Sequence, residues 1–282
     1  SLIGASDEDV NWRQIFIFLG LTGILLAVVV KFTIREPIRG AMEFGEKKAI
    51  NKPPFIESLK SLLKIPAWWA MCFGTAFGAF VSYSKSAFHT KFLVTLDPSF
   101  DFKTLVIILG VINGITYAGG AFFGARLADK WGKRDIRAYG WLPAISISIC
   151  LPIGIMAWWA PSVEINLIFT SLFLLFYGTY LGPCFAIAQT LAPIHMRAMS
   201  TALFFFVINM IGLGLGPTIS GWLIDYFKTT STNIDSMRLA MTSISCVLIA
   251  SIISFLMVAQ KLPKDWKIAE KNNLKLAKTD QA

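Results

Sequence analysis

The most highly charged short run between two long apolar segments is residues 124–137, which read GARLADKWGKRDIR. In it Asp129 and Gly132 lie among five basic residues: Arg126, Lys130, Lys133, Arg134 and Arg137. A carboxylate beside ammonium and guanidinium groups can form charge-assisted hydrogen bonds. Because Lys and Arg in short loops resist translocation across a membrane, we expect this run to form a cytoplasmic loop.

Two further ionisable residues, Lys85 and His89, lie inside the apolar run 67–96. A cation at the centre of a bilayer costs about 2.5–3.5 kcal/mol, so its place requires an explanation. At about 1.5 Å per helical residue, Lys85 lies some 27 Å from Ala67, near the outer interface. It can therefore extend to water there. Alternatively, Lys85 and His89 line the outer part of a cavity and meet an anionic headgroup.

Other polar side chains fall near the middle of apolar runs: Asn113, Tyr117, Tyr177, Tyr180 and Asn209. Polar residues at that depth usually face protein or a water-filled cavity. They are candidates for substrate contact, with hydrogen bonding between helices as the alternative. Near Asn209, Gly212 and Gly216 are predicted to pack closely against another helix, and Pro217 to bend its own helix.

The composition points to a membrane protein, since 55% of the 282 residues are hydrophobic and only 15% are charged. Soluble domains carry about 25% charged residues. Seven runs are long enough to cross a bilayer as helices. They are residues 14–33, 67–96, 104–127, 138–159, 165–191, 198–226 and 237–260. The sequence therefore predicts an all-α, polytopic protein with seven transmembrane helices.

The net charge of +9 is explained by basic residues at the ends of these spans, so no nucleic-acid partner is expected. The four cysteines show no CxxC spacing and are predicted to be small buried residues. The chain has no GxSxG or HExxH motif and only two histidines, one of them His195 in a predicted turn. We therefore expect neither an enzyme nor a metal or other cofactor.

The distribution of basic residues predicts the orientation. Most of them lie between spans one and two, three and four, or five and six, or after span seven, which places those segments and the C-terminus in the cytoplasm. Seven spans then place the N-terminus outside. With no signal peptide and no initiating Met, the chain is expected to be a fragment of a longer protein.

Three runs carry a resemblance to a known family: Trp12-Arg13 with residues 34–37, residues 124–143, and residues 188–227. The charged loop resembles the G-x-L-A-D-R-x-G-R-R signature of the major facilitator superfamily, and the last two runs are similar to its spinster-like branch. If Asp129 is the acid of the signature, its glycine falls on Ala125, with Gly124 beside it.

The resemblance implies helices six to twelve of a twelve-helix fold, with helices one to five in a missing N-terminal half. Residues 1–34 would be an outer segment and helix six, and 35–66 a central cytoplasmic loop with an interfacial helix. Residues 67–260 would be the six-helix C-terminal bundle, and 261–282 a basic cytoplasmic tail. In facilitators, Asp129 and its basic neighbours would form a lock that holds the cytoplasmic side closed.

The resemblance also implies a secondary transporter, in a bacterial inner membrane, that moves an amphiphilic or lysolipid-like solute by alternating access. Membrane lipid, the substrate and the missing half are the expected partners. A carrier of a small organic anion or drug-like compound, and a non-transporting seven-helix receptor or structural protein, are the alternatives. Since no Asp or Glu falls in mid-span, coupling carboxylates for an ion or proton are expected in the missing half.

Overall fold

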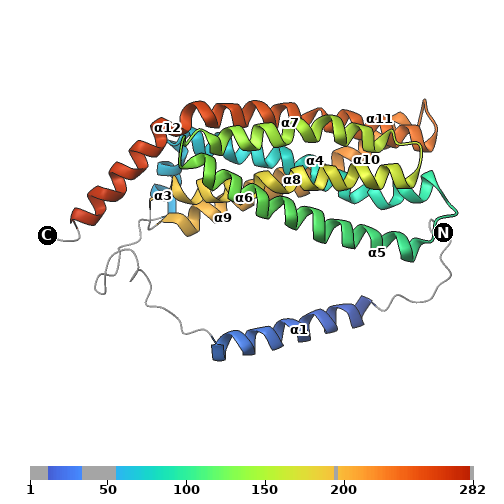
Figure 1. Cartoon of the computed structure of the whole chain (residues 1–282), viewed down its shortest axis with the longest axis horizontal. Helices are drawn as coiled ribbons and strands as arrows, with labels where there is room; N and C mark the ends of the chain where they lie inside the picture. The colour runs from blue at the N-terminus through green and yellow to red at the C-terminus, as the bar shows by residue number, and fades with distance from the viewer. Residues whose placement is uncertain (1–11, 34–54, 194–195, 280–282) are drawn as a thin grey trace. The chain divides into compact units, whose positions relative to one another are not determined.

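The computed structural model describes residues 12–33, 55–193 and 196–279, and every regular element in those ranges is a helix (Figure 1). The chain forms two compact units, residues 1–49 and 50–282, which are described separately. The first contains α1 (Trp12–Thr33), the predicted span 14–33. Most of the central loop 35–66, apart from its end, and also His195 lie outside the described residues.

The second unit is a helical bundle. Its elements are α3 (Phe55–Leu63), α4 (Pro66–Leu96), α5 (Phe102–Ile112), η1 (Asn113–Tyr117), α6 (Ala118–Gly132), α7 (Ala138–Trp158), α8 (Val163–Thr190), α9 (Arg197–Asn209), η3 (Met210–Leu215), α10 (Gly216–Phe227), α11 (Asn233–Ser245) and α12 (Val247–Thr279). Helices cover each of the predicted spans two to seven; they are α4, α5–η1–α6, α7, α8, α9–η3–α10 and α11–α12.

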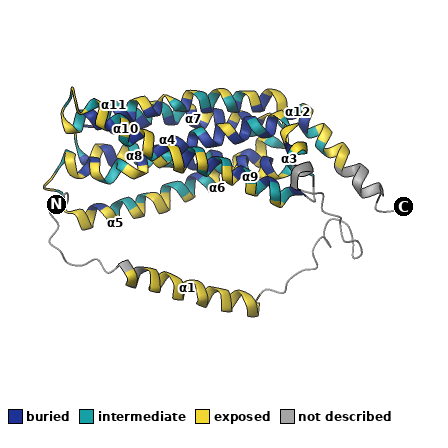
Figure 2. Cartoon of the chain, turned by 180° about the vertical axis from the view of Figure 1, so that it is seen from behind, coloured by how far each residue is buried: buried dark blue, intermediate teal, exposed yellow. Residues whose placement is uncertain are grey.

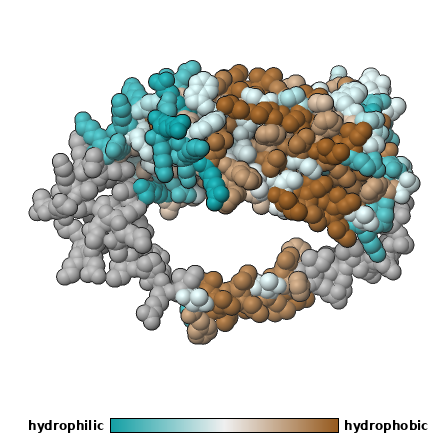
Figure 3. All heavy atoms as spheres, viewed as in Figure 1, coloured by the Kyte–Doolittle hydropathy of each residue, from teal (hydrophilic) through white to brown (hydrophobic). Residues whose placement is uncertain are grey.

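Six helical stretches in the described chain are long and apolar enough to cross a membrane. They are Phe16–Thr33, Phe102–Gly132, Ala138–Trp158, Val163–Thr190, Arg197–Phe227 and Asn233–Asn272. In the bundle an apolar surface separates the two ends, and hydrophilic side chains gather at the α12 end (Figure 3).

The remaining long helix, α4, has 31 residues but is less apolar, and the count of seven spans depends on it. It packs against α12, α8 and the α9–η3–α10 stretch, and half of its side chains are buried (Figure 2). A helix surrounded by other helices can carry polar residues, because these meet protein instead of lipid. The seventh span stays a prediction.

The core of the bundle surrounds α4, with Trp68, Ile147, Tyr180 and Phe255 among its fully buried side chains. Three of the four cysteines are buried, as predicted for small apolar residues. The prediction is wrong for Cys246, which is exposed. Cys246 follows the last residue of α11, at the junction with α12, where its side chain points out of the bundle.

The last helix continues into the predicted basic tail, residues 261–282, because α12 extends to Thr279. Phe255, Val258, Leu262 and Asp265 follow one another at helical spacing and are all buried. The first two turns beyond residue 260 therefore extend the packed face of the last span.

Two spans are interrupted by short π-helices, η1 and η3. An asparagine begins or precedes each of them and donates to the carbonyl four residues earlier: Asn113 Nδ2 to Leu109 O at 3.2 Å, and Asn209 Nδ2 to Phe205 O at 2.8 Å. Such turns often bend a helix, and side chains can satisfy the carbonyls that they release. η3 ends directly before Gly216 and Pro217, where the sequence predicted a bend.

Candidate substrate-binding pocket

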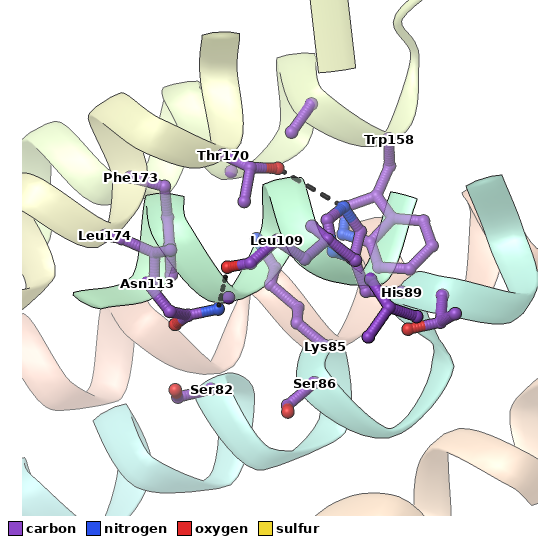
Figure 4. A pocket seen from close by; sticks show the side chains of 15 residues that line it. Ser82, Lys85, Ser86, His89, Leu109, Asn113, Trp158, Thr170, Phe173 and Leu174 are labelled. Carbon is purple, nitrogen blue, oxygen red and sulfur yellow. Dashed lines mark hydrogen bonds between the residues drawn. The ribbon is translucent and has the colours of Figure 1, made fainter. Parts of the chain in front are cut away.

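A pocket of about 400 Å³ opens between α4, the α5–η1 stretch, α7 and α8, in the half of the bundle near the turn that joins α4 to α5 (Figure 4). Its lining residues are Ser82, Lys85, Ser86, His89, Thr90, Val106, Leu109, Gly110, Asn113, Gly154, Ala157, Trp158, Thr170, Phe173 and Leu174. Its volume is within the range of small-molecule sites.

The two long walls of the pocket differ in character. α4 contributes Ser82, Lys85, Ser86 and His89 at positions i, i+3, i+4 and i+7, which share one face of a helix. The facing wall on α5 is mainly apolar, with Val106 and Leu109 among its side chains. The pocket therefore presents a cation and hydroxyl groups on one side and hydrocarbon on the other.

Lys85 is 9% exposed, and its Nζ is buried without a hydrogen-bond partner among the residues that the structure describes. The Nζ lies 4.4 Å from the centre of the Phe173 ring, in the geometry of a cation–π contact. A Cβ at Gly154 would overlap the Nζ. The glycine on α7 and the ring on α8 thus leave room for the end of this side chain inside the bundle.

The two interpretations of Lys85 predict different surroundings for the end of its side chain. A side chain that extends to water at the membrane interface would expose its ammonium group. The Nζ of Lys85 is instead buried and faces α7 and α8. The structure favours the cavity-lining interpretation.

His89 is held in place by a polar group on α8. Its Nε2 lies 2.8 Å from Asn166 Oδ1 and 3.3 Å from Thr170 Oγ1. Asn166 Nδ2 donates to the carbonyl of Ala157 at 2.6 Å, so the amide oxygen faces the imidazole. This network assigns the proton of a neutral His89 to Nε2 and leaves Nδ1 as an acceptor.

The predicted tyrosines lie behind the pocket. Tyr177 stacks on Phe173 with 5.5 Å between ring centres, and Tyr180 donates its hydroxyl hydrogen to Tyr177 at 3.0 Å. Tyr117 is 6.3 Å from Tyr177, again between ring centres. None of the three lines the pocket: Tyr177 contacts its lining residues Phe173 and Ser82, and the other two tyrosines contact Tyr177.

Of the seven predicted cavity residues, the structure brings three into this pocket: Lys85, His89 and Asn113. Asn209 lies on the α9–η3–α10 stretch, half-buried, and also does not line it. Sequence reasoning missed Gly154, Asn166 and Thr170. Nothing in the local sequence pairs a glycine on one helix with a lysine on another, although the polar Asn166 near the start of an apolar run was a usable signal.

The charged loop lies at the opposite end of the bundle, and Asp129, Lys130, Lys133, Arg134 and Arg137 are exposed there. Among the described residues, Asp129 forms no ion pair with these bases. The Tyr139 hydroxyl hydrogen-bonds to Asp129, and the Tyr139 ring covers Gly132, where a Cβ would overlap it. The loop is thus anchored to α7 while its cations face outward.

Close packing of α6 against α8 depends on Gly124. A Cβ there would overlap the backbone of Thr179, whereas Ala125 is exposed. The signature glycine of the resemblance falls on Ala125, so close packing occurs one residue earlier. As predicted, Gly212 and Gly216 also approach another helix closely, here α4 at Ala79 and Phe80.

Comparison with known proteins agrees with this architecture. The profile of the Major Facilitator Superfamily matches residues 2–217. An MFS-type efflux pump of Mycolicibacterium smegmatis is 26% identical over 229 residues, which are 80% of this chain and 51% of that protein. The chain spans about half the length of this curated relative.

Two crystal structures of a bacterial homologue of the human lysosomal transporter Spinster share the fold. The inward-facing, unoccupied form has a TM-score of 0.71 at 23% identity, covering 94% of this chain and 62% of that one. The inward-facing, occupied form has a TM-score of 0.67 at 23% identity, covering 93% and 61%. With the matched profile and the apolar helices, these findings show that the chain is an integral, multi-pass membrane protein that belongs to the major facilitator superfamily.

Proposed function

We propose that this chain forms the C-terminal portion of a secondary transporter that moves an amphiphilic, lysolipid-like organic solute by alternating access. The observation that carries the proposal is the pocket between α4, α5, α7 and α8, with its polar wall and its apolar wall. Facilitators bind substrate between two six-helix halves near the middle of the membrane. A two-sided pocket in one half suits a solute with a polar head and an apolar body.

An N-terminal half would supply the other wall of the cavity. The chain covers 51% of the curated relative and 62% of the unoccupied bacterial structure, which is consistent with such a partner. No acidic side chain lines the pocket among the described residues. We therefore place any carboxylate that couples transport to an ion or proton in the other half, and we count membrane lipid as the remaining partner.

The second candidate is a carrier of a small organic anion or drug-like compound. The similarity to an MFS-type efflux pump favours it. A non-transporting receptor or structural protein is a weaker alternative, because such a role gives no reason for a buried cation beside a pocket.

The orientation proposed from the sequence places the charged loop and the end of α12 in the cytoplasm and the N-terminus outside, in a bacterial inner membrane. Basic residues gather at the charged-loop end of the described bundle, among them Lys130, Lys133 and Lys264. This distribution supports the proposed orientation.

The test uses the full-length protein in lipid vesicles. Uptake of a radiolabelled lysophospholipid is compared with uptake of a fluorescent drug-like cation and a labelled dicarboxylate, each with and without a pH gradient. Ser86→Trp fills the pocket and is expected to abolish flux of the true cargo, while Val94→Trp, exposed on the same helix outside the pocket, leaves it unchanged. Flux of only the drug-like compound or the dicarboxylate selects the second candidate, and no flux of any solute refutes transport.

A further inference from the structure

The amine of Lys85 is a buried basic group, and no acidic side chain lies beside it in the lining of the described pocket. Among the described residues its Nζ has no hydrogen-bond partner, and the centre of the Phe173 ring lies 4.4 Å from it. Among the described residues that line the pocket, none is an Asp or Glu. The charged form of Lys85 therefore has no counter-ion among the described residues of the pocket.

The groups around the Lys85 ammonium hold it in place but give it neither a hydrogen bond nor a negative charge. Phe173 offers the face of its ring, and Gly154 leaves the space that any larger residue would fill. A ring face stabilises a desolvated cation, but by less than the loss of water costs an ion. A bound oxyanion would supply the missing hydrogen bonds and the counter-charge together.

Hydroxyl donors stand on the same face of α4 as the lysine. Ser82 lies one turn before Lys85, and Ser86 is the next residue; both line the pocket. Phosphate and carboxylate oxygens accept hydrogen bonds from ammonium and hydroxyl groups alike. Opposite them, Val106 and Leu109 can cover an alkyl chain.

We propose that this pocket binds the anionic group, a phosphate or carboxylate, of a single-chain amphiphile, with Lys85 as its charged donor. Phe173 and Gly154 act as positioning residues that hold the Nζ at the pocket. The inference rests on the proposed function in treating this ligand as cargo, and it narrows that cargo to anions. Binding itself can be measured without transport.

The experiment measures the thermal stability of the purified full-length protein, because a ligand that binds only the folded state raises Tm. Four probes are titrated at concentrations below micelle formation: octyl phosphate, octanoate, inorganic phosphate and 1-octanol. We expect saturable increases with octyl phosphate and octanoate. Lys85→Gln should weaken the binding of both anions at least tenfold and leave any effect of 1-octanol on Tm unchanged. The control is Lys91→Gln, exposed on the same helix and outside the pocket, which should behave as the wild type.

Two more variants support the assignment if Lys85→Gln is unstable. Lys85→Arg keeps the charge and should retain binding of the anions. Gly154→Ala keeps the lysine but places a methyl group where the Nζ lies. It should therefore weaken the binding of the anions and leave any effect of 1-octanol unchanged.

Each other outcome counts against the proposal. Equal stabilisation by inorganic phosphate and octyl phosphate means a free-anion site and refutes the amphiphile. Equal effects of Lys85→Gln on octyl phosphate and 1-octanol mean that the lysine is structural. No response of the wild type to any anion overturns the inference, whereas the flux assay above would still report on transport.

Discussion

Asp265 Oδ2 accepts the backbone N–H of Ala67 at 2.8 Å, so a side chain near the middle of α12 caps the first turn of α4 from 198 residues away. Ile65, which precedes α4, makes no side-chain hydrogen bond to that helix. A carboxylate at a helix N-terminus satisfies a backbone N–H that has no partner within the helix and interacts favourably with the helix dipole. The contact joins the extension of α12 to the helix that carries Lys85.

Replacing this cap should destabilise the protein. Asp265→Ala is expected to lower the free energy of unfolding by about 1–2 kcal/mol, because the buried N–H of Ala67 loses its acceptor. Asp265→Asn keeps an acceptor oxygen and should lower the free energy of unfolding by less. Thermal unfolding in detergent measures both. Glu270→Ala, exposed on the same helix, is the control, and an equal effect of Glu270→Ala and Asp265→Ala would contradict the capping role.

The contact between α6 and α8 provides a second test. Gly124→Leu should destabilise the protein by about 1–3 kcal/mol or more, because the added side chain meets the backbone of Thr179, which cannot move out of the way alone. Ala125→Leu, at the exposed neighbouring position, should change the unfolding temperature little. The reverse ranking would mean that close packing depends on the signature position and not on Gly124.

Length and apolar pattern were enough to predict the helical architecture and six membrane-spanning stretches, because a bilayer of fixed thickness demands long apolar runs. The same pattern placed Lys85 inside a long helix but left two interpretations of it open. They could be separated only when Gly154 and Phe173, on two other helices, were seen around its Nζ.

The pairing between helices was not predictable from local sequence. Tyr177 and Tyr180 are polar residues near the middle of a long apolar run, which made them candidates for substrate contact. In the structure they hydrogen-bond to each other in the core. The amides of Asn113 and Asn209 each donate to their own helix at a π-turn. The direction of a side chain around a helix axis depends on which partners surround that helix, and a single sequence does not contain that information.

The start of α5 should respond to acid. Asp101 precedes α5, and its carboxylate accepts hydrogen bonds from the Thr104 hydroxyl at 2.7 Å and the Thr104 backbone N–H at 2.8 Å. These bonds hold the pKa of Asp101 below its usual range, the hydroxyl having the larger effect. A depressed pKa means that the cap contributes stability above the unfolded-state pKa of about 3.9 and that this contribution is lost as the pH falls through the folded-state value.

Amide exchange of residues 102–105, corrected for the intrinsic rate at each pH, measures this effect. Protection of the first turn of α5 should fall in acid below about pH 4 in the wild type. Asp101→Asn still caps a helix but does not titrate, so its corrected protection should stay flat over the same window. An identical acid response in both proteins would exclude Asp101 as the titrating group.

The proposed role of Asp129 in gating can be tested in the full-length protein. Asp129 is exposed in the described bundle and hydrogen-bonded by Tyr139, so its acceptor sites remain open to donors from an N-terminal half. Losing a charge-assisted hydrogen bond costs about 1.5–3 kcal/mol, which corresponds to a shift of about tenfold or more between two conformations. Asp129→Asn should therefore slow flux and change the fraction of molecules with a closed charged-loop end.

Labelling reports this conformational shift independently of transport. A cysteine introduced as Ser86→Cys lines the pocket, and its reaction with a membrane-impermeant maleimide measures access from the side opposite the charged loop. We expect Asp129→Asn to reduce that access, because a weaker lock leaves the charged-loop end open more often. Asp135→Asn is the matched control: Asp135 is exposed in the same loop and accepts the backbone N–H of Arg137 at 2.9 Å. If both substitutions leave flux and labelling unchanged, the loop sets the orientation of the protein in the membrane and has no part in gating.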